Sequence, residues 1–262
     1  MPEPRLLTLL TDFGDRDIYV GVMKGAIAQV NSAIRVVDLT HQVPPQDIMA
    51  GRFGLMNAFP YFPQGTVHLV VVDPGVGSQR RAIALELEQG FLVAPDNGIV
   101  SGVVERNQVL RVVELTNRRY WRTEIPSRTF HGRDIFATVA AHIASGVSLL
   151  DLGNEIDVNS LVSLDISLPR LTTDGVIGCI QYIDRFGNCI SNIPDDIVNL
   201  ETWSVRINGK VIPSGKTYSD VAAGNAIALI GSDGWVEIAV NGGNAHQLLG
   251  LNFADTVEVK IY

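Results

Sequence analysis

Apolar and polar positions alternate through the first 160 residues in a pattern that predicts strands and helices in turn. Residues 19–30 carry apolar side chains at helical spacing. Asp47 is the predicted N-cap of a second helix running towards Phe59, and a third helix is predicted from about Asp134 to Ala144. Short apolar runs predict strands at residues 6–10, 34–39, 67–72, 82–87, 91–93 and 109–115. This order predicts a layered α/β domain with a mostly parallel or mixed sheet.

From residue 174 onward the pattern changes to short strands at close spacing. Strands are predicted at residues 176–183, 203–207, 226–230, 236–240 and 257–261. Turn signals such as Asn208-Gly209 and Asp233-Gly234 separate them. We therefore predict an α/β domain over residues 1–164, a linker over 165–173, and a small all-β, barrel-like domain over 174–262.

Composition narrows the class of protein. The chain has 262 residues, of which 46% are hydrophobic and 18% charged, so a sizeable core is available. A net charge of −8 argues against nucleic acid as a partner. No apolar run approaches the roughly 20 residues of a membrane span, and the N-terminal stretch lacks a signal-peptide cleavage site. We expect a cytoplasmic protein with no membrane partner.

Metal and disulfide chemistry find little support in the sequence. Cys179 and Cys189 have no CxxC spacing, and the five histidines form no H-x-x-x-H pair. The two cysteines could face each other across a hairpin, but two buried free thiols are the favoured interpretation. We expect no metal site.

The most informative segment is VVVDPGVGSQR, which ends at Arg80. Its apolar β-branched run stops at Asp73 and is followed by a Pro-Gly turn, the pattern of a buried strand ending at the carboxyl edge of a sheet. Ligands of α/β proteins commonly bind at that edge. On the local pattern alone, Asp73 and Arg80 could equally form a structural ion pair.

Other polar residues also lie at the ends of predicted strands or on loops between predicted elements. Asp12 ends the first strand, where a carboxylate can bind a ribose diol or cap the next helix. Asp96 follows a strand in PDNG, most often simply a turn. His131 lies on a glycine-bearing loop before a helix, and can reach a cleft or serve in capping and packing. Residues 184–188 offer an acid, an aromatic face and an amide between two strands.

Together these segments resemble one family. The order TDFG, VDPGVGSQR, PDNG, TFHGRD, DRFGN and GSDGWVEIAVNGGNA resembles the S-adenosylmethionine (SAM) hydroxide adenosyltransferases, also called SAM hydrolases, over residues 6–262. Relatives of that family use SAM for fluorination and chlorination. The resemblance implies that SAM and water give adenosine and L-methionine, with SAM as substrate and no cofactor. It also implies a homotrimer whose sites are shared between subunits.

The resemblance further implies which residues act. It assigns a catalytic trio to Asp73, Arg80 and His131. Asp12, with Phe13 beside it, is implied to bind the ribose diol. The other implied substrate contacts are Asp73, Asp184, Phe186, Asn188, Ser232, Glu237 and Ala239.

These residues suit the chemistry of a sulfonium. The thioether leaves as a neutral group, so the reaction needs no general acid. It needs a water held in line with C5′ and partly deprotonated as it attacks. Two alternatives stay open: an adenosine- or SAM-binding protein without turnover, and a SAM-dependent halogenase. The second is disfavoured because a carboxylate at Asp73 would repel a halide.

Overall fold

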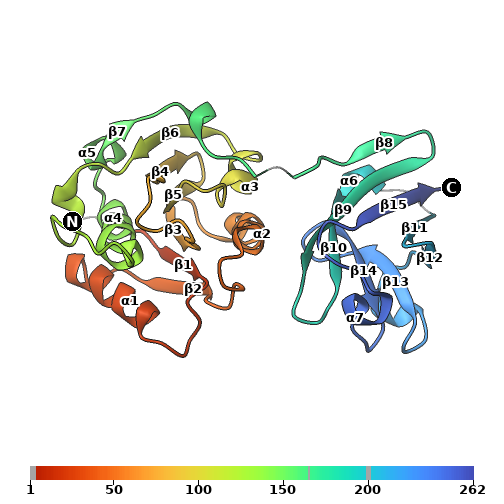
Figure 1. The fold of residues 1–262 in the computed structure, drawn as a ribbon. Helices are drawn as coiled ribbons and strands as arrows, with labels where there is room; N and C mark the ends of the chain where they lie inside the picture. Colours follow the sequence, from red (N-terminus) through yellow and green to blue (C-terminus); the bar gives the residue numbers. More distant parts are fainter. Residues whose placement is uncertain (1–3, 165, 199–201) are drawn as a thin grey trace. The chain divides into compact units, whose positions relative to one another are not determined.

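The computed structural model describes residues 4–164, 166–198 and 202–262 (Figure 1). The chain divides into two compact units, the first ending at Leu164 and the second running to Tyr262. Residues 170–172, which lie inside the predicted linker, form strand β8 and pair with β9 of the second unit. Within the described ranges, no helix combines the length and apolar character needed to cross a membrane.

The first unit is built on a mixed sheet with the strand order β2-β1-β3-β5-β4-β6-β7. The neighbours from β2 to β5 pair in parallel, and β4, β6 and β7 join antiparallel. The prediction of an α/β domain with a mixed sheet is confirmed. The strand bounds are β1 Leu7–Thr11, β2 Val36–Thr40, β3 Thr66–Val71, β4 Ala82–Leu87, β5 Gly90–Pro95, β6 Val109–Glu114 and β7 Asn154–Glu155.

Helices cover both faces of this sheet (Figure 1). Helices α1 (Tyr19–Val30) and α4 (Ala137–Ala144) share one buried core with alternate residues of the strands. Helix α2 (Ile48–Ala58) lies against the strand residues that point to the opposite face, because Gly51 approaches Val72 and Gly54 approaches Leu10. Its N-cap is Asp47, as predicted: the side chain accepts a hydrogen bond from the Ala50 amide. Short helices α3 (Ser101–Val104) and α5 (Leu149–Leu152) complete the unit.

The third predicted helix begins differently from the prediction. A π-helical turn, Gly132–Phe136, comes first, and α4 starts only at Ala137. Asp134 lies inside that turn, and its carboxylate binds arginine side chains instead of capping a helix. π-helical turns are rare and are frequently found at functional sites.

The second unit is an antiparallel sheet with the order β12-β11-β15-β9-β10-β14-β13. An isolated bridge between Ser214 and Ala228 links the β12 and β13 ends, so the sheet is barrel-like and nearly closed, as predicted. Two short helices, α6 (Asp195–Val198) and α7 (Ala245–Leu249), lie beside it. The strand bounds are β8 Arg170–Thr172, β9 Gly175–Ile183, β10 Cys189–Pro194, β11 Trp203–Ile207, β12 Lys210–Pro213, β13 Ala226–Ile230, β14 Trp235–Val240 and β15 Thr256–Ile261.

The cysteines of this unit do not face each other. Cys189 pairs across the hairpin with Ile183, and Cys179 lies further along β9. Both thiols are free; Cys189 is buried and Cys179 is half-buried. Burial raises the pKa of the Cys189 thiol to about 12, so it packs as a small apolar group.

Candidate active site

Strand order brings the predicted acids of the first unit to one edge of the sheet. β1 and β3 are parallel neighbours with Thr11 opposite Val71, so Asp12 and Asp73 both follow the carboxyl ends of adjacent strands. β5 is the next parallel neighbour, and Asp96 follows its last residue. In open α/β sheets this edge is where ligands bind.

A tight turn over residues 73–80, here called the Asp73 turn, follows β3. The Val76 amide donates to the Asp73 carbonyl, and the Ser78 amide donates to that of Gly75. Gly77 has a φ of +78°, and a Cβ there would come within 2.3 Å of the Arg128 carbonyl oxygen. Only glycine fits this position, which holds the turn against the loop leading to His131.

Arg80 folds back across this turn onto Asp73. Its Nε lies 2.9 and 3.1 Å from the two carboxylate oxygens, and its Nη2 lies 2.5 Å from Oδ2. The Arg80 side chain is 10% exposed and the Asp73 side chain is 5% exposed. The Arg80 guanidinium also lies 5.1 Å from the centre of the Phe136 ring. A forked, largely dehydrated pair of this kind has a fixed geometry.

His131 joins the pair from the other side of the loop. Arg80 Nη2 lies 2.8 Å from His131 Nδ1. A guanidinium can only donate, so Nδ1 accepts and the neutral ring carries its proton on Nε2. Burial, followed by the charge of Arg80, lowers the pKa of His131, while the charges of Asp73 and Asp134 act in the opposite direction. The structure thus brings the three predicted trio residues together, with Arg80 in the middle.

Asp134 fixes the loop that carries His131. Its carboxylate is 1% exposed and accepts hydrogen bonds from Arg122 Nε, from Arg133 and from the Ser127 amide, all within 2.7–2.8 Å. These bonds outweigh desolvation and hold the pKa of Asp134 well below its usual value. Sequence reasoning missed this role, although the FHGRD string contains the residue.

Asp12 and Phe13 stand at the end of β1. Asp12 Oδ2 accepts a hydrogen bond of 2.8 Å from the Gln46 amide, and Gln46 itself adopts a φ of +67°. The left-handed backbone of Gln46 had no signal in the sequence. The Phe13 ring packs against Tyr19 and Phe130 at centroid distances of 5.8 and 5.9 Å.

A cavity of about 370 Å³ opens beside these aromatic rings, and one of them, Phe130, directly precedes His131 in the sequence. Its lining mixes aromatic faces with two hydroxyl residues and one guanidinium: Phe13, Tyr19, Ser127, Thr129, Phe130 and Arg133. An aromatic wall can attract a cation, including the sulfonium of SAM. Phe13 was predicted as a substrate contact, whereas Tyr19 and Phe130 were not.

In the second unit, Asp184 closes the turn between β9 and β10. Its Oδ1 accepts from the amides of Phe186 and Asn188, both at 2.8 Å, and its Oδ2 accepts from Asn188 Nδ2 at 3.0 Å. The Phe186 side chain is left 75% exposed. These three predicted contacts therefore form one rigid turn, with an aromatic face presented to solvent.

The remaining predicted contacts lie on or beside β14. Glu237 and Ala239 are two residues apart and share a face, and both are buried. Glu237 Oε1 accepts a 2.8 Å hydrogen bond from the Tyr218 hydroxyl, and burial together with the charges of Asp184 and Asp233 raises its pKa. Ala239 packs against Ile227 and Leu229. Ser232 is exposed in the β13–β14 turn.

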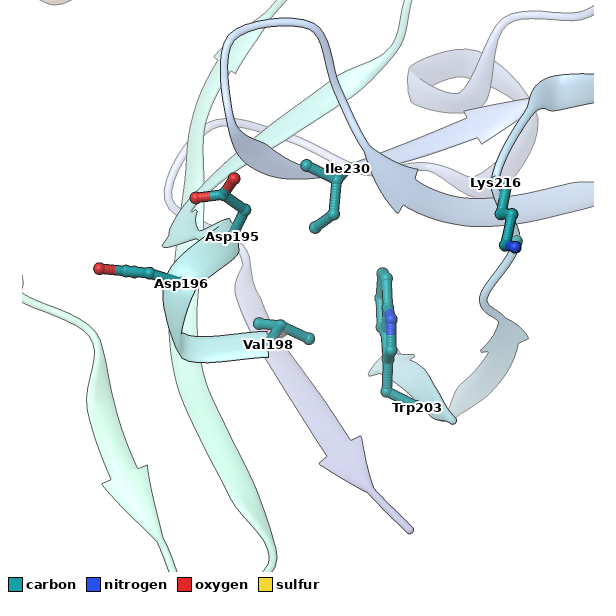
Figure 2. Close-up of a pocket in the computed structure, with 7 residues that line it drawn as sticks. Asp195, Asp196, Val198, Trp203, Lys216 and Ile230 are labelled. Atoms are coloured by element: carbon teal, nitrogen blue, oxygen red, sulfur yellow. The ribbon is translucent and has the colours of Figure 1, made fainter. Parts of the chain in front are cut away.

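The second unit also has a cavity of about 480 Å³, drawn in Figure 2. Figure 2 shows the Trp203 indole and Ile230 beside α6, which carries Asp195 and Asp196. As far as the described residues go, none of the predicted substrate contacts lines this cavity. It is therefore separate from the residues that the sequence pattern selected.

The fold and these clusters define a class: an α/β unit with an acid–guanidinium–imidazole group at its sheet edge, followed by a small barrel-like unit. The family model described as "SAM hydroxide adenosyltransferase N-terminal domain" matches residues 7–153, and the one described as "SAM hydroxide adenosyltransferase C-terminal domain" matches residues 178–258. The chain belongs to the SAM hydroxide adenosyltransferase family.

Curated relatives agree with this assignment, and a solved structure has the same fold. The chain is 40% identical to a Salinispora tropica protein and 38% identical to a Thermus thermophilus protein, both named (R)-S-adenosyl-L-methionine hydrolase. The alignments cover 97% of both chains in the first case, and 94% of this chain and 96% of the relative in the second. An Actinoplanes fluorinase is 25% identical, with 90% of this chain and 91% of the fluorinase covered. A crystal structure of an uncharacterised conserved Thermotoga maritima protein superposes with a TM-score of 0.91 at 37% identity, covering 97% of this chain and 99% of the other.

Proposed function

We propose that this protein hydrolyses SAM to adenosine and L-methionine, by attack of water on C5′, with Asp73, Arg80 and His131 as the catalytic residues. The observation that carries the proposal is the bridging position of Arg80, whose Nη2 lies 2.5 Å from Asp73 Oδ2 and 2.8 Å from His131 Nδ1. Relatives at 37–40% identity over nearly the whole chain bear the name (R)-S-adenosyl-L-methionine hydrolase. The geometry and the relatives thus favour the same reaction.

The geometry divides the work between the three side chains. His131 Nδ1 accepts from Arg80, so Nε2–H is a donor that can orient the water through its oxygen. Asp73 is the basic group of the trio and accepts the proton as the water attacks. The C5′–O bond forms while the C5′–S bond breaks, and the bonding pair stays on sulfur and neutralises the sulfonium. Arg80 holds both partners in place.

Halide transfer fits this site poorly. A halide beside C5′ would have to lose its hydration close to the Asp73 carboxylate, and bringing two like charges together in a buried site is costly. A water molecule instead donates a hydrogen bond to the same carboxylate. The fluorinases are also more distant, at 25% identity or below.

The substrate contacts and the assembly complete the proposal. Asp12 and Phe13 would hold the ribose, and Asp184, Phe186, Asn188, Ser232, Glu237 and Ala239 the rest of the substrate. The family resemblance adds a homotrimer with sites shared between subunits. Light scattering tests the assembly. Mixing Asp73→Asn chains with Asn188→Ala chains tests the shared site, because mixed trimers would regain activity.

The name of the relatives also specifies a configuration, so the sulfur epimers of SAM should be tested separately. We expect purified protein to convert the (R) epimer to adenosine and methionine faster than the (S) epimer, as followed by chromatography. The Asp73→Asn variant serves as the inactive control. Binding of both epimers with no adenosine formed would instead support the binding protein without turnover.

A further inference from the structure

Another buried acid, Asp96, lies close in the fold to the proposed catalytic trio. It follows β5, which lies between β3 and β4 in the sheet, and the sequence pattern indicated only a turn there. Its side chain is 2% exposed. Oδ2 accepts a hydrogen bond of 2.8 Å from Arg81 Nε, and Oδ1 accepts one of 2.9 Å from the Val162 amide. A carboxylate buried this deeply is costly unless it is fully paired, as it is here.

Arg81 connects Asp96 to residues 157–164. Arg81 Nη1 donates to Ser160 Oγ at 2.9 Å, and Nη2 donates to the Ser160 carbonyl. Leu164 lies against Gly98, where an added Cβ would come within 2.5 Å of Leu164 Cγ. Asp96 is therefore held from two sides, and it forms a fixed point at the end of β5.

The same fixed point holds both ends of the Asp73 turn. At its start, Asn97 Nδ2 donates a 2.9 Å hydrogen bond to the carbonyl of Val72, the residue before Asp73. At its end, the Asp96 amide donates to the Arg81 carbonyl at 3.0 Å, in addition to the side-chain pair. Arg80 and Arg81 are consecutive, yet they bind different acids. A displacement of the backbone at Arg81 would therefore be passed on to Arg80.

We propose that Asp96 is a positioning residue of the active site, holding the Asp73 turn so that Arg80 reaches Asp73 and His131 together. The kinetic consequence rests on the proposed hydrolysis. Arg80 Nη2 serves two acceptors at once, and this arrangement tolerates little displacement. A misplacement of about 1 Å can lower a rate by about 10²-fold.

The first test is the kinetics of the full-length Asp96→Asn variant, which keeps the shape of the side chain and removes its charge. We expect kcat for SAM to fall by about tenfold to hundredfold with much less change in KM. Glu86→Gln is the matched control, because it breaks another carboxylate–guanidinium pair on β4, with Arg111. Its kcat should stay at the wild-type value.

The second test is independent of turnover and follows the His131 ring by NMR during a pH titration. The charged groups that act on the pKa of His131 are Arg80, Asp73 and Asp134, and Asp96 is not among them, so Asp96 would act on this pKa through the position of Arg80. Arg80 lowers the pKa of His131, and a loosened Arg80 should let that pKa rise in Asp96→Asn but not in Glu86→Gln. A merely structural Asp96 would lower the melting temperature and leave this titration unchanged.

A folded Asp96→Asn protein with wild-type kcat and wild-type His131 titration would overturn the proposal. Should Asp96→Asn fail to fold, Arg81→Lys gives the same two readouts, because it keeps the charge and loses the forked contact. If the wild-type protein itself makes no adenosine from SAM, the proposed function fails. The titration then still decides whether Asp96 positions Arg80.

Discussion

Arg80 donates a hydrogen bond of 2.8 Å to Nδ1 of His131, which fixes the side of the ring that carries the proton. The same Nη2 binds Asp73. In the proposed reaction, His131 would therefore act as a hydrogen-bond donor through Nε2, and the Asp73 carboxylate would be the basic group of the trio. This division of roles leads to the first two predictions.

Removing any member of the trio should lower kcat far more than SAM affinity. For Asp73→Asn, Arg80→Lys and His131→Gln we expect losses of about 10²–10⁴-fold, typical of a positioned acid–base group. Binding measured by calorimetry should change little. Because the three act as one unit, the double variant Asp73→Asn/His131→Gln should lose little more than the worse single variant. Near-normal turnover in all three single variants would make the trio a structural ion-pair group.

The pH dependence of kcat should reflect the neutral form of His131. Burial and the Arg80 charge lower the pKa of this histidine, so the neutral ring persists below its ordinary value of 6.5. Activity should therefore remain high at pH 6.5 and decline only at more acidic pH, as a pH–rate profile will show. In Arg80→Lys the forked contact with Asp73 is lost, so the pH at which activity declines on the acidic side should differ from that of the wild-type protein. An activity that requires the protonated ring would rise on acidification, contrary to this expectation.

A separate effect of pH concerns stability, through His68. This buried histidine, hydrogen-bonded to Thr8, has its pKa lowered by burial to about 4. The unfolded chain takes up the proton near pH 6.5, whereas the folded chain does so only near 4. The free energy of unfolding should therefore fall as the pH drops through this window, by on the order of 3 kcal/mol. In His68→Gln, the free energy of unfolding, measured by urea unfolding at a series of pH values, should depend less steeply on pH than in the wild-type protein. An equally steep dependence on pH would contradict the assignment.

Asp184 should contribute to stability as well as to substrate binding. Its carboxylate accepts two backbone amides and the Asn188 side chain. Asp184→Ala leaves these donors without their acceptor, which should cost about 1–3 kcal/mol in the free energy of unfolding. Asp184→Asn retains an acceptor for the amides and should be milder. Full stability in Asp184→Ala, combined with lost SAM affinity, would mean that the carboxylate is free for the ligand.

Local sequence patterns predicted elements well where one signal dominates. The apolar run of residues 67–72 predicted β3 to within one residue, and Asp47 caps α2 as expected. Residues 184–188 were predicted to join two strands, but the bounds of the second strand, β10, were not predicted because Ser191 and Asn192 interrupt its apolar pattern. Both are buried, and Asn192 Oδ1 accepts a 2.8 Å hydrogen bond from the Cys179 amide. That bond forms only once β9 is in place.

The site was predictable in part for the same reason. Asp73 and Arg80 are seven residues apart, so a turn between them is a local expectation. His131 comes 51 residues after Arg80, and its approach depends on the close passage of Gly77 beside Arg128. Only the family resemblance placed it with the other two. Asp96 was predicted as a turn, since its partners Arg81 and Val162 are separated from it by 15 and 66 residues.

The most direct test of the proposed hydrolysis is the origin of the oxygen in the product. SAM is incubated with the protein in water enriched in heavy oxygen, and adenosine is analysed by mass spectrometry. Attack of water at C5′ places one labelled oxygen in the 5′-hydroxyl, so adenosine should be heavier by about 2 mass units. Asp73→Asn in the same water should give little adenosine. Unlabelled adenosine, or SAM left intact by a folded protein, would contradict the proposed reaction.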